Sequence, residues 1–439
     1  MGDHFSSFNN FGDASSSSEP EHNRIQWCPI TKCHTNPYAT IGCNAIFSAD
    51  SRIMIHIDGA QGEGGGQIVR SSLALSMLTN QPFTLTNVRA RRSNPGLQRQ
   101  HLTAVLAAAE VSQAVAVGAK LRAKEFSFHP SRIVAGDYHF DIGSAGSVTL
   151  VLQTIMPALM TLPQHSTIQI AGGTHNTMAP PFDFLVQAYL PLLGKIGFSI
   201  ECELIRPGFY PAGGGMIKAT IQPFAAARSL DILDRGKLLK RKIVALLSRL
   251  PKSIGEKEIS QCCRKLQWKS KEGEIQTFEN SRSAGNVCIA QLRYENLTEV
   301  MTEFGKPGLP SESVADRLVR QVNAYLKSEV PIGPHLADQL LLPLGISAHL
   351  AATKQAETKD AATTESATHV TAKNDKTMHD AVSHSALGGG KFLTGPLTDH
   401  SLTHITVLKS FLNIKITQHS ENGKTLVEVL PKPTQTLPS

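Results

Sequence analysis

The sequence predicts an α/β (α+β) protein in which repeated βαβαββ units form a large domain and a smaller α/β domain is inserted. Between residues 51 and 229, short apolar or alternating runs typical of strands take turns with longer segments of helical period. The order strand, helix, strand, helix, strand, strand recurs there, which indicates a repeated structural unit. The pattern changes over residues 230–328 and resumes over 329–432. We therefore predict a large domain from 51–229 and 329–432, with 230–328 as the insertion.

The first unit opens with a glycine-rich turn between a strand and a helix. Residues 1–50 are polar and serine-rich, so we predict a disordered tail before it. Ile53 to Ile57 is apolar, four glycines follow between Gly62 and Gly66, and helical period begins at Ile68. Backbone N–H groups in such a turn can converge on an anion. A dinucleotide fingerprint would need glycine in place of Gln67, and a P-loop would need a lysine, so a tight turn with solvated polar residues is the alternative.

Local periodicity predicts the elements that follow. Strands are expected at residues 82–88, 114–117, 125–129, 167–170 and 217–221, and helices at 101–109, 147–160, 182–196 and 313–326. The inserted segment also carries basic residues at 237 and 240–242. This cluster indicates either a solvated face or a contact with nucleic acid, and the solvated face is the simpler interpretation.

The last third of the chain combines a helix, a polar loop and a final strand, helix and hairpin. A helix is predicted over 334–346. Residues 351–391 have no period and few large apolar side chains, so burial cannot offset their ordering entropy and we predict a disordered loop. A strand from Phe392, a helix after His400 and a hairpin around Asn422-Gly423 complete the chain.

Composition limits the partners and the compartment. The chain has 439 residues, a formal net charge of +7 and a pI of about 9.0, which suits a polyanionic partner. It has no apolar run long enough for a membrane span, and its N-terminus lacks the apolar core of a secretory signal. We therefore expect no membrane association and no secretion. Seven cysteines, an odd number, fit free thiols in a reducing compartment.

Six separated blocks carry a resemblance to a known family. They are Asp58–Arg70 (DGAQGEGGGQIVR), Pro95–Thr103 (PGLQRQHLT), Ile142–Gln153 (IGSAGSVTLVLQ), Gly208–Gly215 (GFYPAGGG), Leu336–Leu340 (LADQL) and Thr394–His400 (TGPLTDH). In this order the chain resembles the RNA 3'-terminal phosphate cyclase family over about 52–432, apart from 351–391. The resemblance also implies the repeated βαβαββ architecture with a smaller inserted domain.

The resemblance implies a ligase-type nucleotidyl transfer in three steps. A histidine, His400 by the motif, attacks the α-phosphate of ATP, and the AMP then passes to the 3'-phosphate of an RNA end. The adjacent 2'-hydroxyl displaces AMP and leaves a 2',3'-cyclic phosphate. An imidazole is a good nucleophile near neutral pH, and a helix that begins at His400 would stabilise phosphate charge. Mg²⁺ (or Mn²⁺) is expected to arrive with ATP. The location implied is the nucleus (nucleoplasm) or the cytoplasm.

The resemblance assigns further residues to the substrates. The ATP or AMP site is expected to use Glu63, Gln153, Pro180, Phe184, Asp338 and Gln339, and Glu63 is also a candidate metal ligand. The RNA phosphate is expected to contact Arg70, Arg89, Arg92, Gln100 and His101. Arginine suits this role because its planar fork can bind two phosphate oxygens. Which carboxylate orients His400, Glu63 or Asp338, stays open.

Some residues depart from the family pattern. His404 follows His400 by one helical turn, so the two could compete or couple. His335 and His175 also differ from relatives near the expected nucleotide site. A catalytically silent relative in ribosome biogenesis is one alternative, although His400, Arg70 and Glu63 are retained. An enolpyruvyl transferase, which would share the repeat architecture, is a second.

Overall fold

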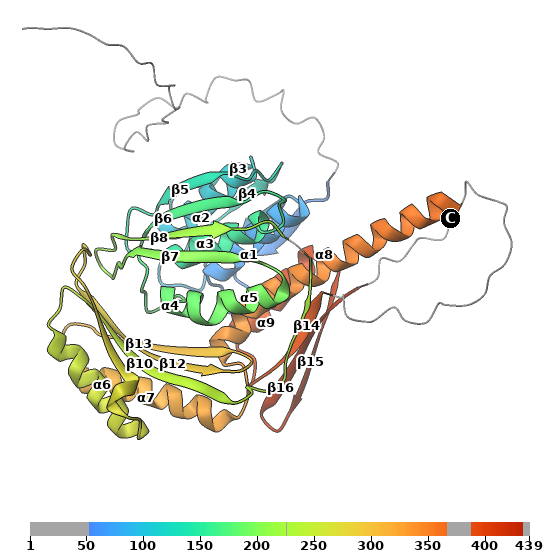
Figure 1. Ribbon diagram of the computed structural model, residues 1–439. Coiled ribbons are helices and arrows are strands. Elements are labelled where there is room, and N and C mark those ends of the chain that lie inside the picture. Colours follow the sequence, from blue (N-terminus) through green and yellow to red (C-terminus); the bar gives the residue numbers. More distant parts are fainter. Residues whose placement is uncertain (1–51, 225, 367–387, 433–439) are drawn as a thin grey trace, which may run out of the picture. The chain divides into compact units, whose positions relative to one another are not determined.

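The computed structural model describes residues 52–224, 226–366 and 388–432. Three four-stranded sheets with the same topology form most of this part of the chain (Figure 1). In each sheet the first two strands are parallel, and the last two strands add in antiparallel fashion with the fourth strand next to the second. A parallel pair needs a crossover connection, which a helix supplies in every unit.

The first unit has the sheet order β1-β2-β4-β3. Its elements are β1 (Ile55–Asp58), α1 (Gly66–Thr79), β2 (Phe83–Thr86), α2 (Arg99–Val111), β3 (Val115–Val117) and β4 (Phe126–His129). The glycine turn therefore connects β1 to α1, as the sequence predicts.

The second unit has the order β5-β6-β8-β7. Its elements are β5 (Asp137–Asp141), α3 (Val148–Leu159), β6 (Ser166–Gly172), α4 (Phe182–Phe184), η1 (Leu185–Tyr189), α5 (Leu190–Ile196), β7 (Ile200–Arg206) and β8 (Gly215–Ile221). The helix predicted over 182–196 thus contains a π-helical turn, η1, in its middle. Such turns occur often at functional sites.

The third unit has the order β9-β14-β16-β15. Its elements are β9 (Ser229–Ile232), α8 (Pro334–Ser366), β14 (Gly389–Thr394), α9 (Asp399–Phe411), β15 (Ile414–Glu421) and β16 (Lys424–Pro431). The chain leaves this unit after β9 and returns to it at α8. The predicted fold class, repeated βαβαββ units with an inserted α/β segment, is confirmed.

The inserted segment forms a fourth sheet, of order β11-β10-β12-β13, with two long helices. Its elements are β10 (Leu238–Ser248), α6 (Lys252–Leu266), η2 (Ser270–Glu272), β11 (Gly273–Phe278), β12 (Gly285–Tyr294), β13 (Thr298–Phe304) and α7 (Ser311–Ser328). Arg241 and Lys242 of the predicted basic cluster are partly exposed and form ion pairs with Glu272 and Glu274. The division into domains at 230–328 stays a prediction.

The helices of the three βαβαββ units pack together and share one core. Helix α1 contacts α2, α3 and α9, and α8 contacts α9, η1 and α5. Leu73, Leu152, Leu340 and Leu408, one from each of α1, α3, α8 and α9, belong to one apolar cluster and are fully buried. Burying a leucine stabilises the fold by about 1.5–3 kcal/mol. Elements far apart in the sequence are thereby brought to one place.

The prediction of a disordered loop over 351–391 was wrong at both of its ends. Helix α8 continues to Ser366, and Figure 1 shows its C-terminal half running past the other helices. Alanine is the commonest residue in 351–366, and alanine together with lysine, glutamine and glutamate favours helix even without an apolar face. At the other end Gly389 and Gly390 already belong to β14, where a Cβ on Gly390 would lie 2.2 Å from the Leu230 carbonyl oxygen.

Other predictions fall on parts of the chain outside the description. The tail at 1–50 and residues 367–387 of the predicted loop lie outside the described residues. Within the described ranges, no helix combines the length and the apolar character that a membrane crossing requires.

Candidate nucleotidyl-transfer site

His400 lies in the first turn of α9, just after the strand β14. Thr398 caps this helix, because its hydroxyl oxygen accepts a hydrogen bond from the Ser401 backbone N–H at 3.1 Å. The first N–H groups of a helix have no intrahelical acceptor, and the helix dipole is positive at this end. The position of His400 therefore suits chemistry on an anionic group.

The imidazole of His400 is oriented by Asp338 of α8. The distance from His400 Nδ1 to Asp338 Oδ1 is 2.9 Å. A carboxylate at this distance favours the tautomer with the proton on Nδ1, which leaves a lone pair on Nε2. Nε2 is thus the nitrogen free to act as a nucleophile. Of the two carboxylates that the sequence left open, Asp338 is the one in contact with His400.

Asp338 is buried but ionised. Burial by itself would raise its pKa, yet the His400 imidazole at hydrogen-bond distance and the nearby imidazole of His404 hold the pKa well below its usual range. Two amides complete its surroundings: Gln67 donates to Oδ1 at 2.9 Å, and Gln339 donates to Oδ2 at 3.0 Å. Gln339 in turn accepts from Gln153 Nε2 at 2.8 Å. A chain of amides therefore fixes the carboxylate on α8 to α1 and α3.

A cavity of about 40 Å³ lies next to this network. It is lined by residues of α1, α3, η1, α8 and α9, namely Gln67, Arg70, Ser71, Leu150, Gln153, Tyr189, Gln339, Leu342, His400 and His404. All three repeated units contribute to it, where their helices meet (Figure 1). Its lining is mainly polar, and Leu150, Leu342 and the ring of Tyr189 form the apolar part.

Arg70 supplies the positive charge of this cavity. Burial lowers its pKa to about 10, the charge of Asp338 opposes that shift, and the charge of Arg89 adds to it. At that pKa the guanidinium stays protonated near neutral pH. Within the described ranges, its side chain has neither a hydrogen bond nor an ion pair. A protonated guanidinium in this state suits an anionic ligand.

His101 packs against the start of α1 as a neutral side chain. Burial, with the nearby charges of Arg70 and Arg89, lowers its pKa to about 3. A Cβ on Gly66 would lie 2.2 Å from His101 Nε2, so only glycine fits at the first position of the helix.

The glycine turn lies against α9, the helix that carries His400. A Cβ on Gly62 would lie 1.8 Å from the hydroxyl oxygen of Thr403, and Gly62 has a φ of +52°. On its other side the turn contacts Arg91 and Arg92, and Arg92 forms an ion pair with Glu63 at 2.8 Å. The sequence predicts one site from the turn and His400, and in the structure the turn packs against the helix that carries His400.

The family model for RNA 3'-terminal phosphate cyclase matches residues 61–418. The chain belongs to this family. Proteins named RNA 3'-terminal phosphate cyclase from Koribacter versatilis, Pseudomonas fluorescens and Ectopseudomonas mendocina are 47%, 41% and 38% identical to it. The matches cover 67%, 83% and 85% of this chain and 83%, 94% and 96% of those proteins.

Membership of the RNA 3'-terminal phosphate cyclase family favours the cyclase interpretation over an enolpyruvyl transferase. The three relatives are bacterial, so they lend no support to the nuclear location that the sequence left open beside the cytoplasm.

Several residues expected at the cyclase site do not line the cavity. Gln100 accepts a hydrogen bond from the Ser147 backbone N–H at 2.7 Å, just before α3. Arg89 donates to the Asn94 and Gly96 carbonyl oxygens at 2.5 and 3.1 Å. Their backbone contacts shape the loops beside the site.

Pro180 and Phe184, both expected at the ATP or AMP site, lie in different surroundings. The Pro180 carbonyl oxygen accepts from the Thr149 hydroxyl at 2.6 Å, which holds the loop before α4 against α3. Phe184 is only 4% exposed and belongs to the apolar core. Neither residue lines the cavity beside His400.

Sequence reasoning assigned no role to some residues that line the cavity. Gln67 and Ser71 share a face of α1 with Arg70, and this spacing of three and four residues was the available signal. Tyr189 projects from the π-helical turn, which periodicity does not reveal. Leu150 and Leu342 look like ordinary core residues in the sequence.

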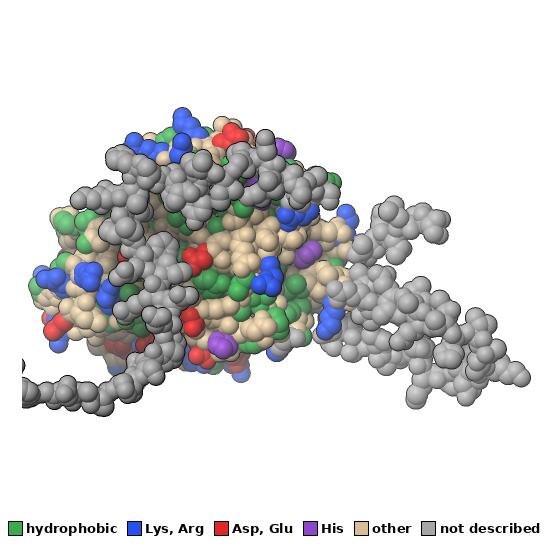
Figure 2. All heavy atoms as spheres, turned by 90° about the horizontal axis from the view of Figure 1, so that it is seen from above, with side chains coloured by type: hydrophobic (Ala, Val, Ile, Leu, Met, Phe, Trp, Pro, Cys, Tyr) green, Lys and Arg blue, Asp and Glu red, His purple; other side chains and the backbone are tan. Residues whose placement is uncertain are grey.

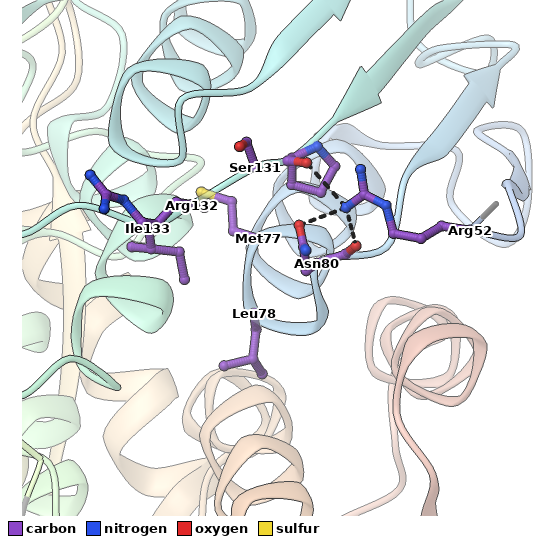
Figure 3. Close-up of a pocket in the computed structure, with 8 residues that line it drawn as sticks. Arg52, Met77, Leu78, Asn80, Ser131, Arg132 and Ile133 are labelled. Atoms are coloured by element: carbon purple, nitrogen blue, oxygen red, sulfur yellow. Dashed lines mark hydrogen bonds between the residues drawn. The ribbon is translucent and has the colours of Figure 1, made fainter. Parts of the chain in front are cut away.

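A larger cavity, of about 500 Å³, opens at the opposite end of α1 (Figure 3). It lies beside Met77 and Asn80, and Arg52 Nη1 donates there to the Asn80 backbone and side-chain oxygens at 2.6 and 2.7 Å. At 1.5 Å per residue, Asn80 is roughly 20 Å along the helix from Gln67. No histidine or carboxylate is among its lining residues, so it lacks groups for nucleotidyl transfer.

Proposed function

We propose that the protein converts an RNA 3'-terminal phosphate to a 2',3'-cyclic phosphodiester, using ATP, through a covalent histidine–AMP intermediate. The observation that carries this proposal is the contact of His400 Nδ1 with Asp338, which frees Nε2 beside the cavity that Arg70 lines. Family membership supports the overall reaction.

In the first step, His400 Nε2 attacks the α-phosphorus of ATP. A bond forms between Nε2 and phosphorus, the bond from phosphorus to the bridging oxygen breaks, and pyrophosphate leaves with the electron pair. Because Nδ1 keeps its proton, the modified imidazole carries a positive charge. Asp338, buried and ionised, stabilises that charge, and Arg70 offsets the charge of the phosphates.

In the second step, an oxygen of the RNA 3'-phosphate attacks the phosphorus held by His400. The bond to Nε2 breaks, the nitrogen regains its lone pair, and an RNA–adenylate forms. In the third step, the 2'-hydroxyl oxygen attacks the 3'-phosphorus, its proton passes to water, and AMP leaves. We assign Arg89, Arg92, Gln100 and His101 to the surroundings of the RNA phosphate.

A divalent cation, Mg²⁺ (or Mn²⁺), would neutralise phosphate charge when it is bound with ATP. Within the described ranges, no three histidine, cysteine or acidic side chains are grouped for metal binding. Glu63, exposed at the glycine turn, would then be a single protein ligand to a cation held mainly by phosphates and water. This donor set fits Mg²⁺, which usually keeps several waters.

The test is incubation with ATP labelled at the α-phosphate, followed by denaturing electrophoresis. We expect a labelled protein whose bond is labile to acid and stable to alkali, as a phosphoramidate should be. His400→Ala should abolish the label, and His349→Ala, a partly buried histidine outside the cavity, should keep it.

A chase then tests the substrate. RNA with a 3'-phosphate should remove the label and gain a cyclic end, whereas RNA with a 3'-hydroxyl should do neither. Absence of label on the wild-type protein, with no cyclic product, would favour the catalytically silent alternative. Consumption of phosphoenolpyruvate would favour the transferase.

A further inference from the structure

His404 is a second histidine in the cavity, one helical turn after His400. Its side chain is almost fully buried, with 5% exposure. Neither Nδ1 nor Nε2 has a hydrogen-bond partner among the described residues. Its Nδ1 is 3.7 Å from Asp338 Oδ1, which is beyond hydrogen-bond distance, and that oxygen already accepts from His400 and Gln67. Buried polar groups rarely remain in this state unless they have a function.

The neighbours of His404 indicate which ligand its nitrogens would bind. Arg70 lines the same cavity and also has no hydrogen bond within the described part of the chain. The carboxylate of Asp338 is turned to His400, Gln67 and Gln339. Two donor side chains therefore face a small space without an acceptor of their own, and an anionic oxygen would pair with both.

We propose that His404, together with Arg70, binds a phosphate oxygen of the group that reacts at His400. His404 donates a hydrogen bond to this oxygen and thereby completes the anion site beside the nucleophile. The inference rests on the proposed function. The oxygen belongs either to the nucleotide or to the RNA 3'-phosphate, and the experiment below uses each as a separate probe.

The test compares three variants of the full-length protein. His404→Leu removes both ring nitrogens at similar volume, and His404→Asn keeps a neutral N–H donor. His349→Leu is the matched control, because it replaces a partly buried helical histidine outside the cavity. Thermal unfolding is measured without ligand, with ATP and with a 3'-phosphorylated dinucleotide, and single-turnover labelling by ATP is measured in parallel.

Without ligand, we expect His404→Leu to raise the unfolding temperature by about 1–3 °C, since it removes buried groups that lack partners. It should also reduce the labelling rate by about tenfold or more. His404→Asn should keep the rate within about threefold of wild type, and His349→Leu should leave it unchanged. If His404 had only a structural role, His404→Leu would lower the unfolding temperature of the ligand-free protein. The probe whose stabilising shift is lost in His404→Leu identifies the source of the phosphate.

Wild-type labelling and wild-type shifts with both probes in His404→Leu would overturn the inference. A lower unfolding temperature in both His404→Leu and His404→Asn would also overturn the inference. If the wild-type protein takes no label but its shift with ATP or the dinucleotide depends on His404, the anion site stands and the proposed function fails.

Discussion

At the scale of single residues, the site is defined by the carboxylate of Asp338 and the four polar side chains around it. His400, Gln67 and Gln339 are within hydrogen-bond distance, and His404 is slightly farther away. An ionised carboxylate fixes both the tautomer and the direction of the nucleophile. It also opposes the charge that His400 would gain when it bonds to phosphorus.

We predict that Asp338→Asn lowers the rate of self-labelling by roughly 10²- to 10⁴-fold, because an amide does not fix the reactive tautomer. The unfolding temperature of Asp338→Asn should stay close to that of wild type. Single-turnover labelling with α-labelled ATP measures the rate. Asp316→Asn, in an exposed ion pair with Lys265 on the inserted segment, is the control and should label normally. A wild-type rate in Asp338→Asn would remove Asp338 from the mechanism.

At the scale of secondary structure, the cap of α9 holds His400 at the entrance of the cavity. The Thr398 hydroxyl accepts from the third N–H of the helix. We predict that Thr398→Ala reduces the free energy of unfolding by about 1 kcal/mol and also slows labelling. Thr406→Ala is the control, since Thr406 is exposed on the same helix and its hydroxyl donates to the Leu402 carbonyl oxygen of that helix. Denaturant unfolding gives the free energies, and equal effects of the two changes would contradict the role of the cap.

Helix α6 of the inserted segment carries a buried acid whose protonation affects stability. Burial raises the pKa of Glu258 to about 7, although Asn286 donates to Oε1 and opposes the shift. The folded protein therefore binds this proton more tightly than the unfolded chain does. Stability from this group is complete below about pH 4.5 and is lost as the pH rises through 7.

We predict that Glu258→Gln is about 1–3 kcal/mol more stable than wild type at pH 8 and nearly equal to it at pH 5. Chemical unfolding at both pH values measures this difference. His101, whose pKa is lowered to about 3, contributes equally to both proteins and cancels. A difference that is the same at pH 5 and pH 8 would show that Glu258 does not titrate in this range.

Strong periodicity let the sequence predict most elements but not their irregular parts. The helix expected over 147–160 corresponds to α3, because its apolar residues leave no other interpretation. The π-helical turn at η1 was missed, since one extra residue per turn hardly changes an amphipathic pattern. The helical residues after 350 were missed because low hydrophobicity was given more weight than helix propensity.

At the scale of the whole molecule, the repeats explain why the site could be predicted only in part. Gln67 and Asp338 are 271 residues apart, and their contact follows from the packing of helices that belong to different units. Motif resemblance identified Asp338, Arg70 and His400 separately. The amide network and the unpartnered nitrogens of His404 depend on side-chain packing, which no local pattern encodes.

The distribution of surface charge does not indicate where RNA would bind. On the face drawn in Figure 2, Lys and Arg side chains are scattered among acidic, polar and apolar ones. The net charge of +7 therefore suits a polyanion in general, without marking a path for RNA on this face.

The two faces of the inserted sheet pack against two different apolar clusters. On β12, Cys288 and Leu292 belong to the apolar cluster beneath α6 and α7, whereas Val287 and Ile289 belong to the core of the repeated units. Successive side chains of a strand point to opposite faces, so one strand joins both clusters. Strong coupling of this kind favours unfolding of the insertion together with the rest of the described core.

We predict one calorimetric unfolding transition for the protein, shifted downward as a whole by Ile289→Ala and by Leu292→Ala. Each side chain is fully or almost fully buried, so each truncation should cost about 2–5 kcal/mol. ATP, which would bind about the helices of the repeated units, should raise the same transition in both variants. A separate, earlier transition in Leu292→Ala that ATP did not shift would instead show that the insertion unfolds as an independent domain. In that case Ile289→Ala should affect both transitions, because Ile289 lies at the interface that the two parts share.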